Sequence, residues 1–232
     1  MPTNVSAPQP ESDAKAPYEL AGTFGVSRIA MKLAYSPASP YVRKVRVCAE
    51  ECGLANRIEN VATKVLPSEP NRDYARMAPL MKVPSLELDD GTVLFDSIVI
   101  CEYLDQLCGA GKLFPPVGDK RWRALRLHAL GDGILDAAVL TRYETFLRPE
   151  ALRWDAWTKG QLLKVDQALD YLEANVRDLD GINIGTIAVG CALGYLDFRY
   201  ADRRWRDSRP RLAAWYETMA QRESFKKTVP QG

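Results

Sequence analysis

The stretch that decides the fold runs from residue 31 to residue 53 and reads MKLAYSPASPYVRKVRVCAEECG. Its first five residues have the short apolar alternation of a β-strand, and the Ser-Pro-Ala segment 36–38 follows as a turn. Ser39 and Pro40 then predict a helix start, because serine is a good N-cap and proline in the first helical position loses no hydrogen bond. Apolar residues share one face of this helix, and Gly53 supplies its stop. The stretch therefore predicts a strand followed by a helix.

The segments that follow extend this unit into a small sheet. A weaker strand pattern covers residues 58–65, and three prolines then interrupt the chain. Residues 85–88 and 92–95 alternate on either side of an Asp-Asp-Gly turn and predict a β-hairpin. Asp96 and Ser97 then cap a helix over residues 98–107. The order β-α-β-(α)-β-β-α predicts an α/β thioredoxin-like domain, with a right-handed parallel crossover and an antiparallel hairpin.

A domain of this type has a cis proline just before its third strand, and Val83-Pro84 stands at that place. A cis bond before proline is a minority conformer, so the sequence alone makes it a prediction.

The second half of the chain is helical by pattern. Residues 109–118 contain glycines and a Pro-Pro pair and predict a linker. Beyond them, helical periodicity covers four segments, namely 120–147, 154–175, 183–200 and 210–221. We therefore predict a thioredoxin-like domain over residues 31–108 and an all-helical bundle over residues 119–232.

Composition excludes several classes of protein. The net charge is +1, so no global field would draw the protein to nucleic acid or to an acidic membrane. No apolar run approaches the roughly 20 residues that span a bilayer. Five cysteines at irregular spacing and one histidine give no zinc pattern, and they predict reduced, mostly buried thiols in a cytoplasmic protein. Residues 1–30 lack the apolar segment of a signal peptide and predict a disordered leader.

Three further signals favour structural roles. His128 lies inside a helical segment and has no nucleophile motif to serve. The Gly-Asp-Gly at 131–133 resembles half of a dinucleotide-binding motif, but no strand precedes it. The segment 199–211 has six arginines, but aspartates interrupt it, and a solvated helix face is favoured over nucleic-acid binding.

Several passages, in their order and spacing, resemble the cytosolic glutathione transferase family over residues 31 to about 229. SPYVRK at 39–44 resembles the opening of its serine-type classes, and KVPSL at 82–86 resembles its K-V/I-P-x-L stretch. FDS-x-x-I at 95–100 resembles its E/D-S-x-x-I. AVGCALGYLD at 188–197 and P-x-L-x-x-W at 210–215 resemble its core helix and its closing helix.

The chain departs from the family pattern at the start of the core helix. The family has an S/T-x-x-D capping box there, and this sequence has Asn183 and Thr186. Threonine is a poorer reciprocal acceptor than a carboxylate, which predicts a weaker cap by about 1 kcal/mol.

The resemblance implies a site for glutathione, with Ser39 at the reacting thiol. A thiol with a pKa near 8.5 is mostly protonated at neutral pH, so the protein must favour the thiolate. A hydroxyl donor at a helix N-terminus does this through its hydrogen bond and through the helix dipole. Ser39 stands at such a position, and Ser36 is the competing hydroxyl. Without the resemblance, Ser39 would be interpreted as an ordinary helix cap.

The rest of the implied site holds the remainder of the tripeptide. Ser97 would offer its hydroxyl and its N–H to the γ-glutamyl carboxylate, and Asp96 would accept from the γ-glutamyl ammonium; a purely capping role is the alternative for both. Val83 would pair its backbone with the cysteinyl residue of glutathione, and Pro84 in cis would leave the pairing groups free. Lys82 would steady the glycyl carboxylate or remain in solvent.

Two functions follow from these residues. The first is a glutathione transferase that adds the thiolate to a small hydrophobic electrophile, or reduces a peroxide with it, in detoxification and without a metal or tightly bound cofactor. Serine at residue 39 cannot form the mixed disulfide of thiol–disulfide exchange. The alternative is a non-catalytic module of the same fold that binds a ligand or a protein. The resemblance also implies a homodimer, and the second substrate is expected against residues 131–143.

Overall fold

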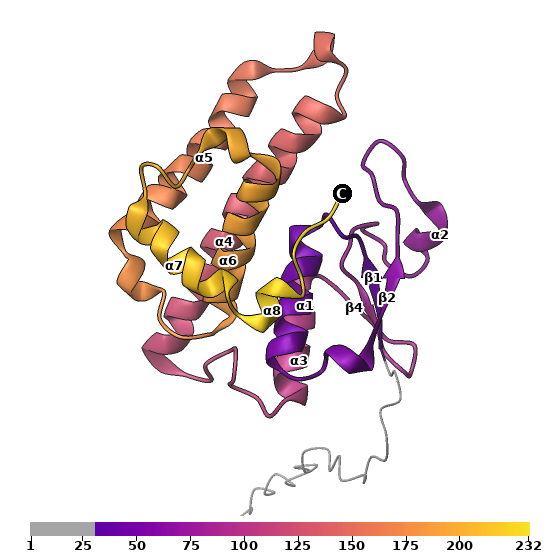
Figure 1. The fold of residues 1–232 in the computed structure, drawn as a ribbon. Coiled ribbons are helices and arrows are strands. Elements are labelled where there is room, and N and C mark those ends of the chain that lie inside the picture. The colour runs from indigo at the N-terminus through magenta and orange to yellow at the C-terminus, as the bar shows by residue number, and fades with distance from the viewer. Residues whose placement is uncertain (1–30) are drawn as a thin grey trace, which may run out of the picture.

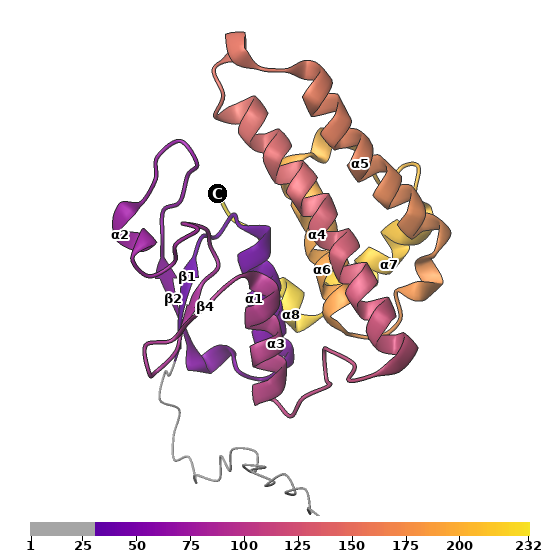
Figure 2. The ribbon, with the colours of Figure 1, turned by 180° about the vertical axis from the view of Figure 1, so that it is seen from behind.

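The computed structural model describes residues 31–232. The prediction of a disordered leader over residues 1–30 lies outside the described residues. Figures 1 and 2 show a small sheet at one side of the molecule and a bundle of longer helices at the other, with α1 and α3 lying between them.

The first half of the chain forms a four-stranded mixed sheet and its helices. These elements are β1 (Met31–Tyr35), α1 (Pro40–Glu51), η1 (Ala55–Arg57), β2 (Ile58–Ala62), α2 (Arg72–Ala75), β3 (Leu86–Glu87), β4 (Val93–Leu94) and α3 (Ser97–Leu107). The strand order is β2-β1-β3-β4. Strands β1 and β2 are parallel, whereas β3 pairs antiparallel with both β1 and β4. The predicted thioredoxin-like architecture is confirmed, although β2 ends three residues before the predicted strand and each hairpin strand has only two residues.

The second half is helical, as predicted. Its elements are α4 (Gly118–Phe146), η2 (Glu150–Leu152), α5 (Asp155–Ala174), η3 (Val176–Asp178), α6 (Ile184–Arg199), η4 (Ala201–Arg203), α7 (Pro210–Ala220) and α8 (Glu223–Lys226). The four predicted helices are present within two residues at each end, and the short α8 is an addition that the periodicity did not reveal.

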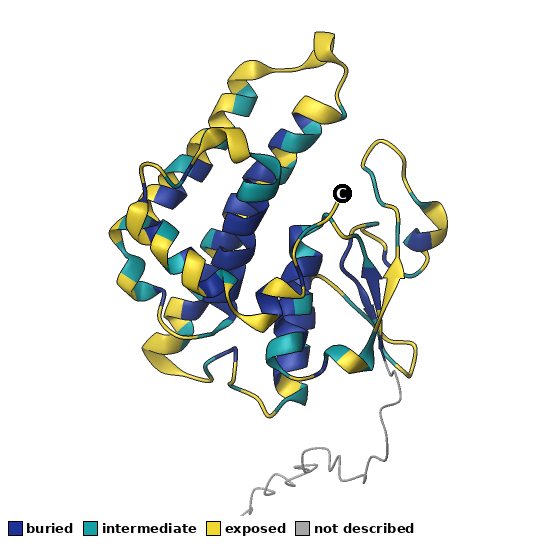
Figure 3. Ribbon diagram, in the orientation of Figure 1, coloured by how far each residue is buried: buried dark blue, intermediate teal, exposed yellow. Residues whose placement is uncertain are grey.

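Helix α6 is the centre of the helical bundle, and each of its residues from 184 to 196 is buried (Figure 3). It packs most closely against α4, and glycines permit the approach. A Cβ at Gly131 would lie 2.7 Å from the backbone carbon of Ala188. Gly131 therefore serves helix packing, and this explains the glycine that resembled half of a dinucleotide motif.

Arg43 carries the packing between α1 and the end of the chain. It is only 5% exposed, its guanidinium lies 5.3 Å from the centre of the Phe225 ring, and its Nη2 donates to the Phe225 carbonyl at 3.4 Å. Gly194 on α6 makes room for it, because a Cβ there would lie 2.1 Å from Nη1 of Arg43. An arginine stacked on an aromatic ring thus joins the two halves of the fold.

Candidate functional site

Ser39 is the N-cap of α1, and its hydroxyl donates to no other group in the described part of the chain, residues 31–232. Its Oγ accepts a hydrogen bond from the Val42 N–H at 3.3 Å, and its own N–H donates to the Ser36 carbonyl at 3.1 Å. The residue is half-buried, in extended conformation (φ −77°, ψ 120°), and followed by Pro40 in the first helical turn. A hydroxyl that accepts one hydrogen bond can still donate its proton. Ser39 can therefore cap the helix and also bind an anion at the helix start.

The peptide bond between Val83 and Pro84 is cis, as the sequence predicted. Both residues are buried and lie just before β3. Within residues 31–232, no backbone hydrogen bond uses the N–H or carbonyl of Val83. An extended peptide could therefore pair with this backbone as an added strand.

Tyr74 on α2 holds the chain around this cis bond, and no pattern in the sequence indicated this role. Its hydroxyl donates to the Lys82 carbonyl at 2.9 Å and lies 2.7 Å from the Ser85 Oγ. The two contacts tie down the residues on either side of Val83 and Pro84. The Lys82 side chain itself is exposed.

Asp96 and Ser97 form the start of α3. Asp96 is the N-cap, and its Oδ1 accepts from the Ile98 N–H at 3.2 Å. Ser97 is the first helical residue and only 3% exposed. The predicted cap is confirmed, and the peptide between Phe95 and Asp96 is also cis. The first backbone N–H groups of a helix have no partner within it, so this start can receive a carboxylate.

Helices α1 and α3 begin at the same end of the sheet. Their C-caps, Cys52 and Cys108, touch at the other end, with 2.7 Å between the two Sγ atoms. The helices have 12 and 11 residues, and they lie side by side and run in the same direction, so both starts lie at the opposite end (Figures 1 and 2). Ser39 and Ser97 therefore belong to one face of the molecule.

A buried polar cluster fixes α1 against α4 next to this face. Lys44 is fully buried, and its Nζ donates to His128 Nε2 at 2.9 Å and to both carboxylate oxygens of Asp132 at 2.7 Å. An ammonium has three protons, so every donor of Lys44 is used. His128 is therefore structural, as predicted, whereas nothing in the sequence indicated its two partners.

Burial sets the charges in this cluster. It lowers the pKa of His128 from 6.5 to about 3, and the positive charge of Lys44 acts in the same direction. Burial raises the pKa of Asp132, although Lys44 opposes the shift. His128 is therefore uncharged at neutral pH, and its Nε2, 3.2 Å from Asp132 Oδ2, accepts from Lys44 and forms no ion pair with the carboxylate. The negative charge of Asp96 raises the pKa of both His128 and Asp132, so the start of α3 faces α4 here.

Two distant segments, α4 and the end of the chain, contact the start of α1 and the turn before it. The Tyr41 hydroxyl donates to Asp136 on α4, and burial is the main reason that its pKa is raised. The Gln231 N–H donates to the Pro37 carbonyl at 3.3 Å, and Arg199 Nη1 donates to the Gly232 carbonyl at 3.1 Å. The last residues of the chain thus lie against the turn before Ser39 (Figure 1), which the sequence did not predict.

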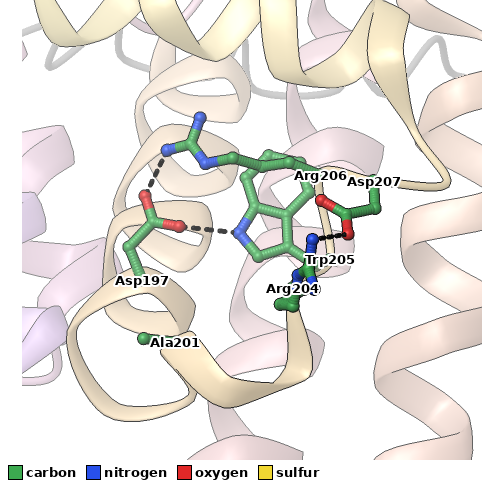
Figure 4. Close-up of a pocket in the computed structure, with 6 residues that line it drawn as sticks. All are labelled: Asp197, Ala201, Arg204, Trp205, Arg206 and Asp207. Atoms are coloured by element: carbon green, nitrogen blue, oxygen red, sulfur yellow. Dashed lines mark hydrogen bonds and ion pairs between the residues drawn. The ribbon is translucent and has the colours of Figure 1, made fainter.

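The arginine-rich segment 199–211 forms no solvated helix face, and this expectation was wrong. It crosses the turns between α6 and α7, where its side chains form ion pairs with acidic residues of α5, α6 and α7. A hollow of about 300 Å³ lies here. At its lining, Trp205 Nε1 donates to Asp197 at 2.8 Å and Arg206 pairs with the same carboxylate (Figure 4). Because its charges are already paired and Ser39 is not in its lining, we do not assign the site to it.

Two classes of site find no support in the part of the chain that the structure describes. Residues 31–232 hold no group of three or more His, Cys, Asp or Glu side chains placed to bind a metal ion. None of the helices in this range combines the length and the apolar character needed to cross a membrane.

Comparison with known proteins assigns the family. Models described as Glutathione S-transferase, N-terminal domain, and Glutathione S-transferase, C-terminal domain, match residues 38–107 and 155–218. An uncharacterized GST-like protein of Escherichia coli, YibF, is 35% identical over 86% of this chain and 98% of its own. The chain belongs to the glutathione S-transferase family.

Solved structures of this glutathione S-transferase family include similar proteins with glutathione bound. A glutathione transferase family member from Pseudomonas fluorescens Pf-5, with bound glutathione, is 46% identical and covers 88% of this chain and 100% of its own, with a TM-score of 0.85. A structure from the same source, with bound S-(propanoic acid)-glutathione, is also 46% identical, covers 87% and 100%, and has a TM-score of 0.81.

Proposed function

We propose that this protein is a glutathione transferase in which Ser39 stabilises the thiolate of bound glutathione. The observation that carries the proposal is the pair of helix starts, α1 and α3, together with the backbone of Val83, which makes no backbone hydrogen bond within residues 31–232. Together they provide a hydroxyl, a positive helix end and an extended edge for a tripeptide. The glutathione bound to similar proteins supports the same ligand here.

Glutathione would lie across this face with its two ends held separately. The γ-glutamyl carboxylate takes the N–H and hydroxyl of Ser97, and its ammonium donates to Asp96. The cysteinyl backbone pairs with Val83 beside the cis Pro84. Lys82, which is exposed, extends toward the glycyl carboxylate through solvent.

Ser39 would act on the thiol. Its Oγ accepts a hydrogen bond from Val42 N–H, and its own O–H would donate a hydrogen bond to the sulfur of glutathione. This hydrogen bond favours the charged sulfur and lowers the thiol pKa. The partial positive charge at the start of α1 acts in the same direction. The thiol proton passes to water, and the thiolate attacks the second substrate.

The second substrate would approach beside α4. Tyr41, two residues after Ser39, is bonded to Asp136, which supports residues 131–143 as part of the lining. A small hydrophobic electrophile or a peroxide fits this proposal, with detoxification in the cytoplasm as the role. The S-substituted glutathione bound to a similar protein supports room for a group on the sulfur.

We also propose a homodimer. Val99 on α3 is 44% exposed and Trp122 on α4 is 68% exposed, and the ion pair between Arg121 and Glu102 joins these two helices. Apolar side chains on adjacent helices favour burial against a second copy. Light scattering of the purified protein tests this, and a monomer at micromolar concentration would contradict it.

Calorimetric titration with reduced glutathione tests the site. We expect saturable binding by the wild type and affinity roughly 10- to 100-fold lower in Asp96→Ala, because a hydrogen bond to a charged group contributes about 1.5–3 kcal/mol. Asp89→Ala is the matched control, since Asp89 is an exposed acid in the hairpin turn. Absence of binding at millimolar glutathione would contradict the proposal, and the ligand- or protein-binding module would replace it.

A further inference from the structure

The five cysteines fall into two groups by exposure. Cys48, Cys101 and Cys191 are fully buried, as the prediction of buried thiols requires. Cys52 and Cys108 are half-buried, and their Sγ atoms lie 2.7 Å apart. The described chain therefore holds one accessible pair of thiols.

The backbone fixes this pair. Cys52 is the C-cap of α1 and Cys108 is the C-cap of α3, and both N–H groups are bonded within their own helix ends. The Sγ atoms of Cys108 and Cys52 lie 2.7 Å apart, and Cys108 Sγ lies 3.5 Å from the Asp105 carbonyl oxygen. The two thiols are 56 residues apart in the sequence, and their sulfur atoms are in direct contact in the fold. The sulfur atoms are therefore within about 1 Å of the bond length of a disulfide, about 2.05 Å.

The surroundings of the pair make oxidation slow. Burial raises the pKa of Cys52, the hydrogen bond with Cys108 adds to this, and the charge of Lys112 opposes it. Little thiolate is then present at neutral pH, and thiolate is the attacking species in disulfide exchange. The pair is suited to respond to a sustained change in redox conditions.

We propose that Cys52 and Cys108 form a reversible disulfide with glutathione disulfide as the oxidant. The Cys52 thiolate attacks one sulfur of glutathione disulfide, and one glutathione thiolate leaves and takes up the proton that Cys52 lost. The Cys108 sulfur then attacks the Cys52 sulfur of this mixed disulfide, and the second glutathione leaves with the Cys108 proton. Two protein thiols and one glutathione disulfide thus give one protein disulfide and two glutathione molecules.

The disulfide would lock the two helices that carry the glutathione site. It joins α1 and α3 at their far ends, whereas Ser39 and Ser97 lie at their starts. A crosslink across 56 residues restricts the unfolded chain, so the oxidised protein is expected to melt about 5 °C or more above the reduced protein.

The test uses the full chain in buffers with increasing ratios of glutathione disulfide to glutathione. Free thiols are blocked with a maleimide after denaturation, and the crosslinked peptides are mapped by mass spectrometry. We expect one crosslink, between Cys52 and Cys108, which returns to free thiols with excess glutathione. Cys108→Ser should show no crosslink and no rise in melting temperature, and instead carry glutathione on Cys52.

Cys48→Ala is the matched control, because Cys48 lies one turn before Cys52 on α1 and is fully buried. It should form the same crosslink as the wild type. Mapping of the wild type alone decides the matter if a variant fails to fold. Five maleimide-labelled thiols at the most oxidising ratio, or a crosslink that involves another cysteine, would overturn the proposal.

Discussion

Helices α1 and α6 both begin with a polar cap, but the two caps differ in what they leave unused. Asn183 Oδ1 accepts from Gly185 N–H at 2.9 Å and Thr186 N–H at 3.2 Å, while Thr186 Oγ1 accepts from Asn183 N–H at 2.9 Å. Ser39 accepts one bond of 3.3 Å from Val42 N–H, and its hydroxyl proton has no partner within residues 31–232. We call the α6 cap closed, because its side chains are fully hydrogen-bonded to the helix start, and the α1 cap open, because its hydroxyl can still donate a hydrogen bond.

The comparison separates stability from function. The capping box at Asn183 is complete, because the Thr186 hydroxyl takes the place of the missing carboxylate. The weaker cap expected from this exchange stays a prediction. A cap whose acceptor is already used by two backbone N–H groups has no capacity left for a ligand. An open cap on a half-buried serine is weaker for the helix but can bind an anion. A substitution in the α6 cap should therefore lower the stability and leave glutathione binding unchanged. A substitution of Ser39 should instead change the thiol of bound glutathione.

The largest effect is expected at Gly185, directly inside the closed cap. A Cβ there would lie 2.4 Å from the Ala124 carbonyl oxygen and 2.6 Å from Leu127 Cβ. Gly185→Ala should therefore lower the free energy of unfolding by about 3 kcal/mol or more, measured by urea denaturation. Gly133→Ala is the control, because open space surrounds that helical glycine, and it should raise stability by up to about 1 kcal/mol. Equal effects of the two substitutions would contradict the close approach of α4 and α6.

The second largest effect is a pH dependence of the free energy of unfolding. It comes from the contact of α1 with α4 through Lys44, His128 and Asp132. The pKa of His128 is about 3 in the folded protein and near 6.5 in the unfolded chain. Between these values the unfolded chain binds more protons, so the free energy of unfolding falls with decreasing pH. We expect His128 to account for a loss of about 2 kcal/mol between pH 6.5 and pH 5.

Urea denaturation of the wild type and His128→Gln at several pH values measures this contribution. Asp132 acts in the opposite direction, because its raised pKa makes the folded protein bind protons more readily. The difference between the two proteins isolates the histidine, and it should shrink as the pH falls. A difference that is independent of pH would show that His128 titrates normally in the folded state.

The smallest effect is expected for the cap of α6 itself. Asn183→Ala removes the acceptor for two backbone N–H groups and should lower the free energy of unfolding by about 1 kcal/mol. Its affinity for glutathione should equal that of the wild type. Asn56→Ala, at an exposed asparagine, is the control and should change neither. A loss of glutathione affinity in Asn183→Ala would remove the distinction between the two caps.

Much of the fold could be predicted because its signals are local. The strand, turn and helix at 31–53, the hairpin at 85–95 and the caps at Ser39 and Asp96 each follow from a few neighbouring residues. The predicted cis bond at Pro84 came from the order of the elements and is present. Short elements such as α8 lack a full helical period, so pattern alone does not reveal them.

The parts of the site that escaped prediction depend on contacts between distant residues. Lys44 and Asp132 are 88 residues apart, and each looks like an ordinary surface charge in the sequence. Tyr74 lies in a four-residue helix with no pattern, yet it holds the chain around Pro84. The acidic partners of the arginines in 199–211 are likewise spread over three helices. Only the folded chain brings such pairs together.

The most direct test of the central claim is the pKa of the thiol of bound glutathione, followed through the ultraviolet absorbance of the thiolate at saturating glutathione. We predict that the wild type holds this pKa below the value near 8.5 of a free thiol, and that Ser39→Ala raises it by about 1 to 2 while glutathione remains bound. Ser36→Ala should leave the pKa as in the wild type. The same thiol pKa in the wild type and in Ser39→Ala, or a rise in Ser36→Ala alone, would contradict the role of Ser39.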